Sequence, residues 1–121
     1  MKLLIVDDSS VVRRAIQRHI DDGRVSEIIE ARNGVEAVTM FTVHRPDLVT
    51  MDITMPEMDG IRAVEELVKL RPDVRILIVS AMADKHTAIQ AVRKGAKGFL
   101  LKPFNSVELN EALEEILTDG I

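Results

Sequence analysis

Five short apolar runs alternate along this chain with five stretches in which apolar residues recur at helical spacing. The runs comprise Leu3 to Val6, a weaker one around residues 26 to 31, Asp47 to Met51, Val74 to Val79 and Phe99 to Leu101. Strict alternation of strands and helices predicts a parallel sheet with helices on both of its faces. Right-handed crossovers narrow the topology, and five units favour a doubly wound, flavodoxin-like (βα)5 fold of the α/β class with strand order 2-1-3-4-5.

Capping residues and chain breakers place the helices between these runs. Ser9 or Ser10 can cap the first helix, and Asn33 with Glu36 forms a capping box for the second. The later helices are expected to run through Leu70, over about 84 to 94, and from the cap Asn105 onward.

The apolar positions also predict which helical residues face the core. The second helix is expected to bury Val35, Val38 and Phe41 or close neighbours of these residues. The apolar residues Ala88, Ile89 and Val92 mark the fourth helix without indicating which of them is buried. The chain has no Trp or Tyr and only three Phe, so the core must be aliphatic.

Length and composition indicate one domain over residues 1–121, with 46% apolar and 30% charged residues. The absence of cysteine excludes disulfides, thiolate zinc sites and thiol catalysis. The net charge is −4, and Lys and Arg are scattered without a basic stripe, which argues against nucleic acid as a partner. No apolar run approaches a membrane span, and Asp7 and Asp8 interrupt the first one at once. We therefore expect a soluble, cytoplasmic protein with no membrane partner.

Polar side chains follow four of the five predicted strands. Asp7 and Asp8 come directly after the first, Asp52 after the third, Ser80 after the fourth and Lys102 after the fifth. Ligands of open parallel α/β sheets bind at the carboxyl ends of the strands. The first, third, fourth and fifth strands are neighbours in the predicted order. We therefore expect these side chains to converge on one patch.

These residues together indicate a specific chemistry, although each of them alone is weak evidence for a function. Taken singly, an Asp pair after a strand is more often a helix cap, and a lone Ser or Lys is uninformative. Three adjacent carboxylates disfavour one another's ionisation, and a hard cation with oxygen ligands such as Mg²⁺ resolves this. Lys102 adds a positive charge and Ser80 a hydroxyl. Together they surround the Asp52 carboxylate, a nucleophile, with groups that stabilise a phosphoryl group in transfer.

The histidines do not join this set. His19, His44 and His86 fall on separate predicted helices without metal-ligand spacing, and we interpret them as structural or surface residues.

Four motifs of the chain resemble the receiver domain of bacterial response regulators, in the same order and spacing over roughly residues 2 to 118. They are Asp7-Asp8 in LLIVDDSS, Asp52 in VTMDITMPEMDG, Ser80 in LIVSAM, and Lys102-Pro103-Phe104 in GFLLKPF. The resemblance implies that a histidine kinase phosphorylates Asp52 to give an aspartyl phosphate.

The resemblance also implies the roles of the other residues. Asp8 and Asp52 would coordinate Mg²⁺ directly, Asp7 would help through water, and the backbone carbonyl of Thr54 would be a further metal ligand. Lys102, after which the family has a cis peptide bond to proline, would pair with the phosphoryl oxygens. Gly60 would allow an unusual turn before the third helix. Two further residues would form the switch. Ser80 would donate a hydrogen bond to the phosphoryl group, and Phe99 would pack inward when Ser80 moves.

Within the family, the strings VTMDITMPEMDG, SAM and GAKGFLLKPF look most like chemotaxis receivers of the CheY type. The resemblance implies an output surface over about 84 to 118 that binds a target in trans, such as a flagellar motor switch protein. Thr54 and Met82 differ from the residues of the best-known chemotaxis proteins and flank the route of the attacking water. We therefore expect that the phosphate is lost slowly from Asp52 and that a dedicated phosphatase helps to remove it. Separately, we expect the protein to be a monomer.

Three alternatives remain open at this point. The chain could be a phosphorelay receiver outside chemotaxis, with the same fold and chemistry but another partner. It could be an aspartyl-phosphate phosphatase of the haloacid-dehalogenase type, although such enzymes need a second acid where Thr54 stands. It could be a flavin-binding module, although Asp7 and Asp8 would repel a phosphate after the first strand. The resemblance to receiver domains favours a signalling protein that is not an enzyme.

Overall fold

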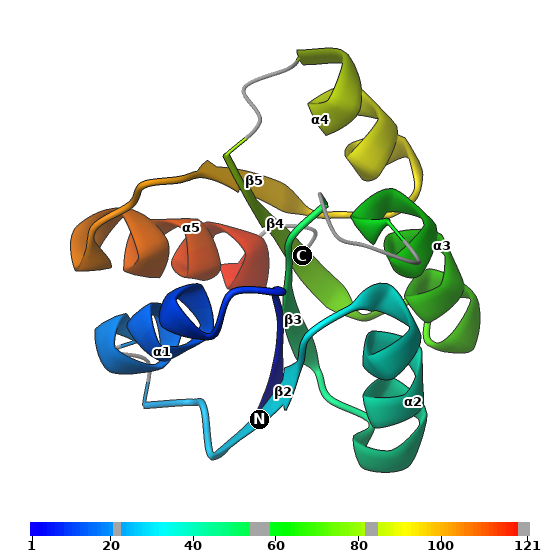
Figure 1. The fold of residues 1–121 in the computed structure, drawn as a ribbon, viewed down its shortest axis with the longest axis horizontal. Coiled ribbons are helices and arrows are strands. Elements are labelled where there is room, and N and C mark those ends of the chain that lie inside the picture. Colours follow the sequence, from blue (N-terminus) through cyan, green and yellow to red (C-terminus); the bar gives the residue numbers. More distant parts are fainter. Residues whose placement is uncertain (21–22, 54–58, 82–84, 119–121) are drawn as a thin grey trace.

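The sheet of this protein has five parallel strands in the order β2-β1-β3-β4-β5, as the sequence predicts. The structure is a computed structural model that describes residues 1–20, 23–53, 59–81 and 85–118. Figure 1 shows the strands side by side at the centre of the molecule. Their bounds are Lys2–Val6 (β1), Glu27–Ala31 (β2), Leu48–Met51 (β3), Arg75–Ser80 (β4) and Gly98–Leu101 (β5).

Helices cover both faces of the sheet. Helices α1 and α5 lie on one face, and α2, α3 and α4 lie on the other (Figure 1). Taken over the described residues, none of them combines the length and the apolar character that crossing a bilayer requires. Their bounds are Ser10–His19 (α1), Gly34–His44 (α2), Gly60–Leu70 (α3), Lys85–Arg93 (α4) and Ser106–Thr118 (α5).

The core consists of two aliphatic layers, one on each face of the sheet. Leu3 and Ile5 of β1 pack beneath α1 and α5, whereas Leu4 and Val6 pack beneath α2 and α3. Side chains of a strand alternate between faces, and a sheet covered on both faces needs apolar residues at every position. This requirement explains why the strands read as continuous apolar runs in the sequence.

The predicted caps begin the helices. The Ser9 hydroxyl accepts a hydrogen bond from Val12 N at 3.3 Å, so Ser9 rather than Ser10 is the cap of α1. Asn33 Oδ1 accepts from Glu36 N at 2.7 Å at the start of α2. At α5 the box is reciprocal, since Asn105 Oδ1 accepts from Glu108 N and Glu108 Oε1 accepts from Asn105 N.

The prediction of which residues the second helix buries was right for Phe41 and wrong for Val35. In α2 the buried positions are Gly34, Ala37 and Phe41, while Val35 is 49% exposed. One residue turns a helix by about 100°, so a shift of one position moves a side chain off the core face. In α4 the exposed fractions of Ile89 and Val92 are 45% and 54%.

A polar contact at the amino ends of the strands sets the register of β1 against β3. Asp47 Oδ2 accepts from Lys2 N at 3.1 Å, and Asp47 Oδ1 lies 3.1 Å from Arg71 Nη2. Burial alone raises the pKa of Asp47, but the Lys2 hydrogen bond and the Arg71 guanidinium outweigh it and hold that pKa below its usual value. Because Val6 then pairs with Met51, both strands end level at the opposite edge.

The Thr50 side chain in the middle of β3 gives a first prediction. It is 1% exposed, and its hydroxyl has no hydrogen-bond partner within the part of the chain that the structure describes. An unsatisfied buried hydroxyl costs free energy, so Thr50→Val is expected to raise the free energy of unfolding by about 1 kcal/mol. Urea unfolding measures this, with Thr42→Val on the exposed side of α2 as the control. A lower urea midpoint for Thr50→Val than for wild type would show that the hydroxyl has a partner in solution.

Candidate functional site

The carboxyl edge of the sheet gathers the polar residues that the sequence singled out. Asp7 follows β1 and Asp52 follows β3, directly after the paired residues Val6 and Met51. Ser80 ends β4. All three polar side chains are buried, with exposed fractions of 1% for Asp7, 3% for Asp52 and 0% for Ser80.

Three carboxylates form a cluster at this edge. One side-chain oxygen from each of Asp7, Asp8 and Asp52 lies within 4.8 Å of the others. Asp8 is exposed, whereas the other two are buried. Buried carboxylates require a cation or hydrogen-bond donors, and oxygen donors of this kind suit a hard divalent ion such as Mg²⁺. The donor set therefore fits the predicted metal, with Asp8 on the solvent side.

Lys102 lies against this cluster from β5. Its Nζ is 2.7 Å from Asp7 Oδ2 and 3.7 Å from Asp52 Oδ2, and its side chain is 18% exposed. Its backbone N–H donates to the Ser80 carbonyl at 2.8 Å, and its peptide bond to Pro103 is cis. Three carboxylates and one ammonium leave two formal negative charges, which one divalent cation would balance.

Backbone contacts hold the two buried aspartates in place. Asp7 N donates to Ala31 O at 3.1 Å, and Asp52 N donates to Val6 O at 2.9 Å. Arg13 Nη1 donates to Asp7 O at 2.6 Å. The sequence did not predict this contact of Arg13. Two arginines are adjacent there, and nothing in the sequence indicates that the side chain of Arg13 rather than that of Arg14 reaches the end of β1.

Gly60 supports Asp52 through a close contact that the sequence did not predict. The backbone torsion φ is positive at Gly95 but not at Gly60 among the described glycines. Residues 54–58 lie outside the described part of the chain, so the unusual turn expected before the third helix stays a prediction. Gly60 is needed because a Cβ there would lie 2.2 Å from Asp52 O and 2.4 Å from Ile53 Cα. The first residue of α3 thus packs directly on the backbone of Asp52.

The predicted switch residues flank the same edge. Ser80 is buried at the end of β4, next to Leu101 of β5. Phe99 of β5 is partly buried and packs against the core layer under α2 and α3. Thr54 and Met82 lie outside the described residues.

Comparison with known proteins agrees with this geometry. The family model described as the response regulator receiver domain matches residues 3–114. The chemotaxis protein CheY of Listeria monocytogenes is 42% identical over 115 residues, which cover 95% of this chain and 97% of that protein. CheY of Bacillus subtilis is 42% identical over 96% of this chain and 97% of its own length. The structure of the CheX-CheY-BeF3-Mg²⁺ complex from Borrelia burgdorferi is similar with a TM-score of 0.92 and 29% identity, covering 98% of this chain and 90% of that one.

Proposed function

Because this chain belongs to the response regulator receiver family, in its CheY type, we propose that it is a single-domain cytoplasmic signalling switch phosphorylated on Asp52. The observation that carries the proposal is the placement of one buried carboxylate, Asp52, beside two others and a lysine. A histidine kinase is the proposed phosphodonor. The Asp52 carboxylate attacks the phosphorus atom, the bond to the kinase imidazole breaks, and the phosphoryl group ends as an acyl phosphate.

The residues around Asp52 have two proposed roles, which are to bind the metal ion and to contact the phosphoryl group. Asp8 and Asp52 would hold Mg²⁺ directly, with Asp7 acting through water and the Thr54 carbonyl as a further ligand. When bound, the ion would supply positive charge at the phosphoryl oxygens, where charge accumulates during transfer. Lys102, already within 3.7 Å of Asp52 Oδ2, moves from its carboxylate partners to a phosphoryl oxygen. The Borrelia CheY structure named above contains Mg²⁺ and BeF3, which supports this metal for the present chain.

The output of the switch is proposed to be the surface of α4, β5 and α5. Ser80 would donate a hydrogen bond to the phosphoryl group, and Phe99 would pack further inward in response. A receiver acts by shifting a population between two surfaces rather than by turnover of a substrate. Exposed apolar side chains for a target are present there, with Ile89, Val92, Leu101 and Val107 exposed by 45% or more.

The chemotaxis identity of the target rests on the CheY relatives and is tested by binding. A labelled peptide from a flagellar motor switch protein is titrated with the protein before and after treatment with a small-molecule phosphodonor and Mg²⁺. We expect phosphorylation to tighten binding by about 10-fold, within the usual range of coupling energies. Asp52→Asn should show no such change. A protein that accepts the phosphoryl group yet binds the peptide in neither state would favour a phosphorelay receiver outside chemotaxis.

A further inference from the structure

The guanidinium of Arg13 joins three elements at the edge of the carboxylate cluster. Its Nη1 donates to the backbone oxygen of Asp7 at 2.6 Å, and its Nε lies 2.9 Å from Glu30 Oε1 on β2. The Arg13 side chain is 16% exposed, whereas that of Glu30 is 45% exposed. Arg13 therefore bridges α1, the end of β1 and the edge strand β2 from a largely buried position.

The oxygen that Arg13 contacts belongs to the peptide group that joins Asp7 to Asp8. A peptide group is planar, so a contact that fixes its oxygen also fixes the direction in which the chain enters Asp8. The Asp7 carboxylate is held separately, because Ser9 N donates to its Oδ1 at 2.9 Å and Lys102 Nζ lies 2.7 Å from its Oδ2. The Asp8 side chain is exposed and has no hydrogen bond or ion pair with any residue that the structure describes. Arg13 thus restrains the backbone that carries Asp8.

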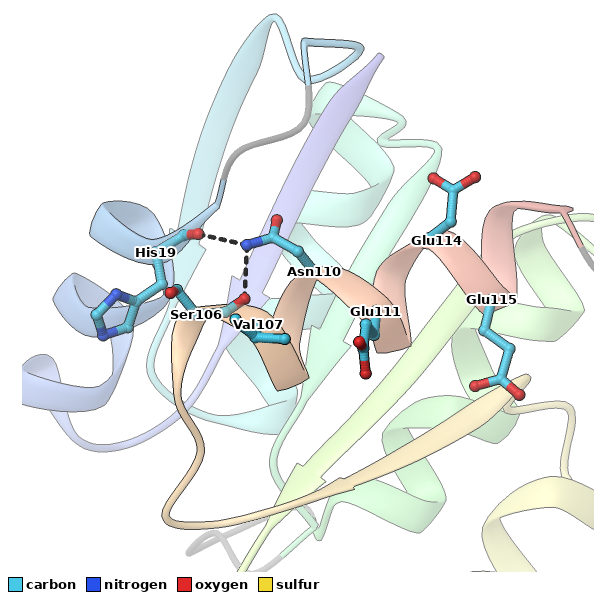
Figure 2. Close-up of a pocket in the computed structure, with 7 residues that line it drawn as sticks. All are labelled: His19, Ser106, Val107, Asn110, Glu111, Glu114 and Glu115. Carbon is cyan, nitrogen blue, oxygen red and sulfur yellow. Dashed lines mark hydrogen bonds between the residues drawn. The ribbon is translucent and has the colours of Figure 1, made fainter.

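Helix α1 holds Arg13 in a fixed place because it is anchored at both ends. Ser9 caps its first turn, and Ile16 in its middle is buried against the sheet. At its other end, Asn110 of α5 donates through Nδ2 to the backbone oxygen of His19 at 2.7 Å (Figure 2). The guanidinium therefore projects from a rigid support toward the end of β1.

We propose that Arg13 is a positioning residue for the Mg²⁺ site, and that Glu30 both orients its guanidinium and neutralises its charge. The inference rests on the proposed function, in which Asp8 and Asp52 hold the metal. Groups that orient metal ligands from outside the coordination sphere contribute strongly to metal affinity, and their loss typically lowers it by about 10- to 100-fold. Because Arg13 acts through the peptide group that precedes Asp8, it supplies geometry rather than a ligand atom.

A purely electrostatic role of Arg13 would have the opposite effect. A positive charge beside a cation site weakens cation binding, so removing an arginine that acted only by its charge would tighten Mg²⁺ binding. Removing an arginine that orients Asp8 weakens Mg²⁺ binding instead. The sign of the change in affinity therefore separates the two roles.

Calorimetric titration of the metal-free full chain with Mg²⁺ tests the inference. We expect Arg13→Met to weaken Mg²⁺ binding about 10-fold, as the loss of an orienting group does. Arg13→Lys keeps the charge but lacks the fork that reaches Asp7 O and Glu30 together, so it should weaken binding by about 3-fold. Glu30→Gln should also weaken binding by about 3-fold, because it leaves the Arg13 charge uncompensated at a half-exposed position.

Two matched controls separate this contact from a general effect of charge. Arg14→Met removes a positive charge from the adjacent, exposed position on α1. Glu111→Gln removes a negative charge from the groove between α1 and α5, where Glu111 is exposed (Figure 2). At about 0.15 M salt distant exposed charges are screened, so both controls should bind Mg²⁺ within about 2-fold of wild type.

The outcomes distinguish this inference from the proposed function. Mg²⁺ binding by Arg13→Met that equals or exceeds that of wild type overturns the inference and leaves the proposed function intact. Wild type that binds no Mg²⁺ at millimolar concentration contradicts the proposed metal itself and the inference with it. Urea unfolding with a chelator establishes that each titrated variant is folded. If Arg13→Met does not fold, wild-type affinity in Arg13→Lys overturns the inference.

Discussion

Replacing Lys102 by methionine is expected to lower the free energy of unfolding by about 3 kcal/mol at neutral pH without metal. Lys102 Nζ is 2.7 Å from Asp7 Oδ2, and Asp7 is 1% exposed. Removing the cation leaves a buried carboxylate uncompensated beside two others, and the loss of one partner of a buried pair is strongly destabilising. Urea unfolding in the presence of a chelator measures the loss.

Mg²⁺ is expected to restore most of the stability that Lys102→Met loses. A ligand that binds only the folded state stabilises it by RT ln(1 + L/Kd), where L is the free ligand concentration. The carboxylates that would hold the metal are intact in this variant. Phosphoryl signalling should remain impaired, since no ammonium meets the phosphoryl group. Lys97→Met, at an exposed lysine, is the control and should stay within about 0.5 kcal/mol of wild type. A Lys102→Met protein as stable as this control would contradict the assigned contact.

Gly60→Ala is the second change with a large expected effect. The new Cβ would lie 2.2 Å from Asp52 O, a backbone atom that cannot move without shifting β3 or α3. Overpacking of this kind costs about 2–3 kcal/mol. Because the displaced atom belongs to Asp52, phosphoryl acceptance should fall together with stability.

A matched glycine makes this effect specific. A Cβ at Gly23 meets nothing within 4 Å, so Gly23→Ala should leave both stability and phosphoryl acceptance near the wild-type values. Urea unfolding and labelling with a phosphodonor are measured on both variants. Equal behaviour of the two would mean that α3 does not pack on Asp52 as described.

The sheet and the site could be predicted because both depend on local sequence order. Alternation of apolar runs with amphipathic stretches is enough to define a parallel α/β sheet, and its topology brings the ends of β1 and β3 side by side. Asp7 and Asp52 could therefore be assigned to one edge before any distance was known. The same argument placed Lys102 there through β5.

The features that escaped prediction depend on contacts between distant segments. Whether Val35 or Ala37 is buried depends on the rotation of α2 about its own axis. The apolar pattern of this helix is compatible with both rotations. The role of Gly60 is a close approach of α3 to Asp52, and no residue type near either position indicates it. Arg13 contacts Asp7 because of the way α1 is oriented on the sheet. The sequence alone does not distinguish Arg13 from its neighbour Arg14 for this contact.

The central claim is that Asp52 is the phosphoryl acceptor, and intact-protein mass spectrometry after labelling with a small-molecule phosphodonor and Mg²⁺ tests it most directly. Wild type and the exposed-site control Asp73→Asn should each gain the mass of one phosphoryl group, and a chelator should prevent the gain. Asp52→Asn should gain none, because it lacks the carboxylate nucleophile. Labelling of Asp52→Asn to the same extent as wild type would contradict the claim.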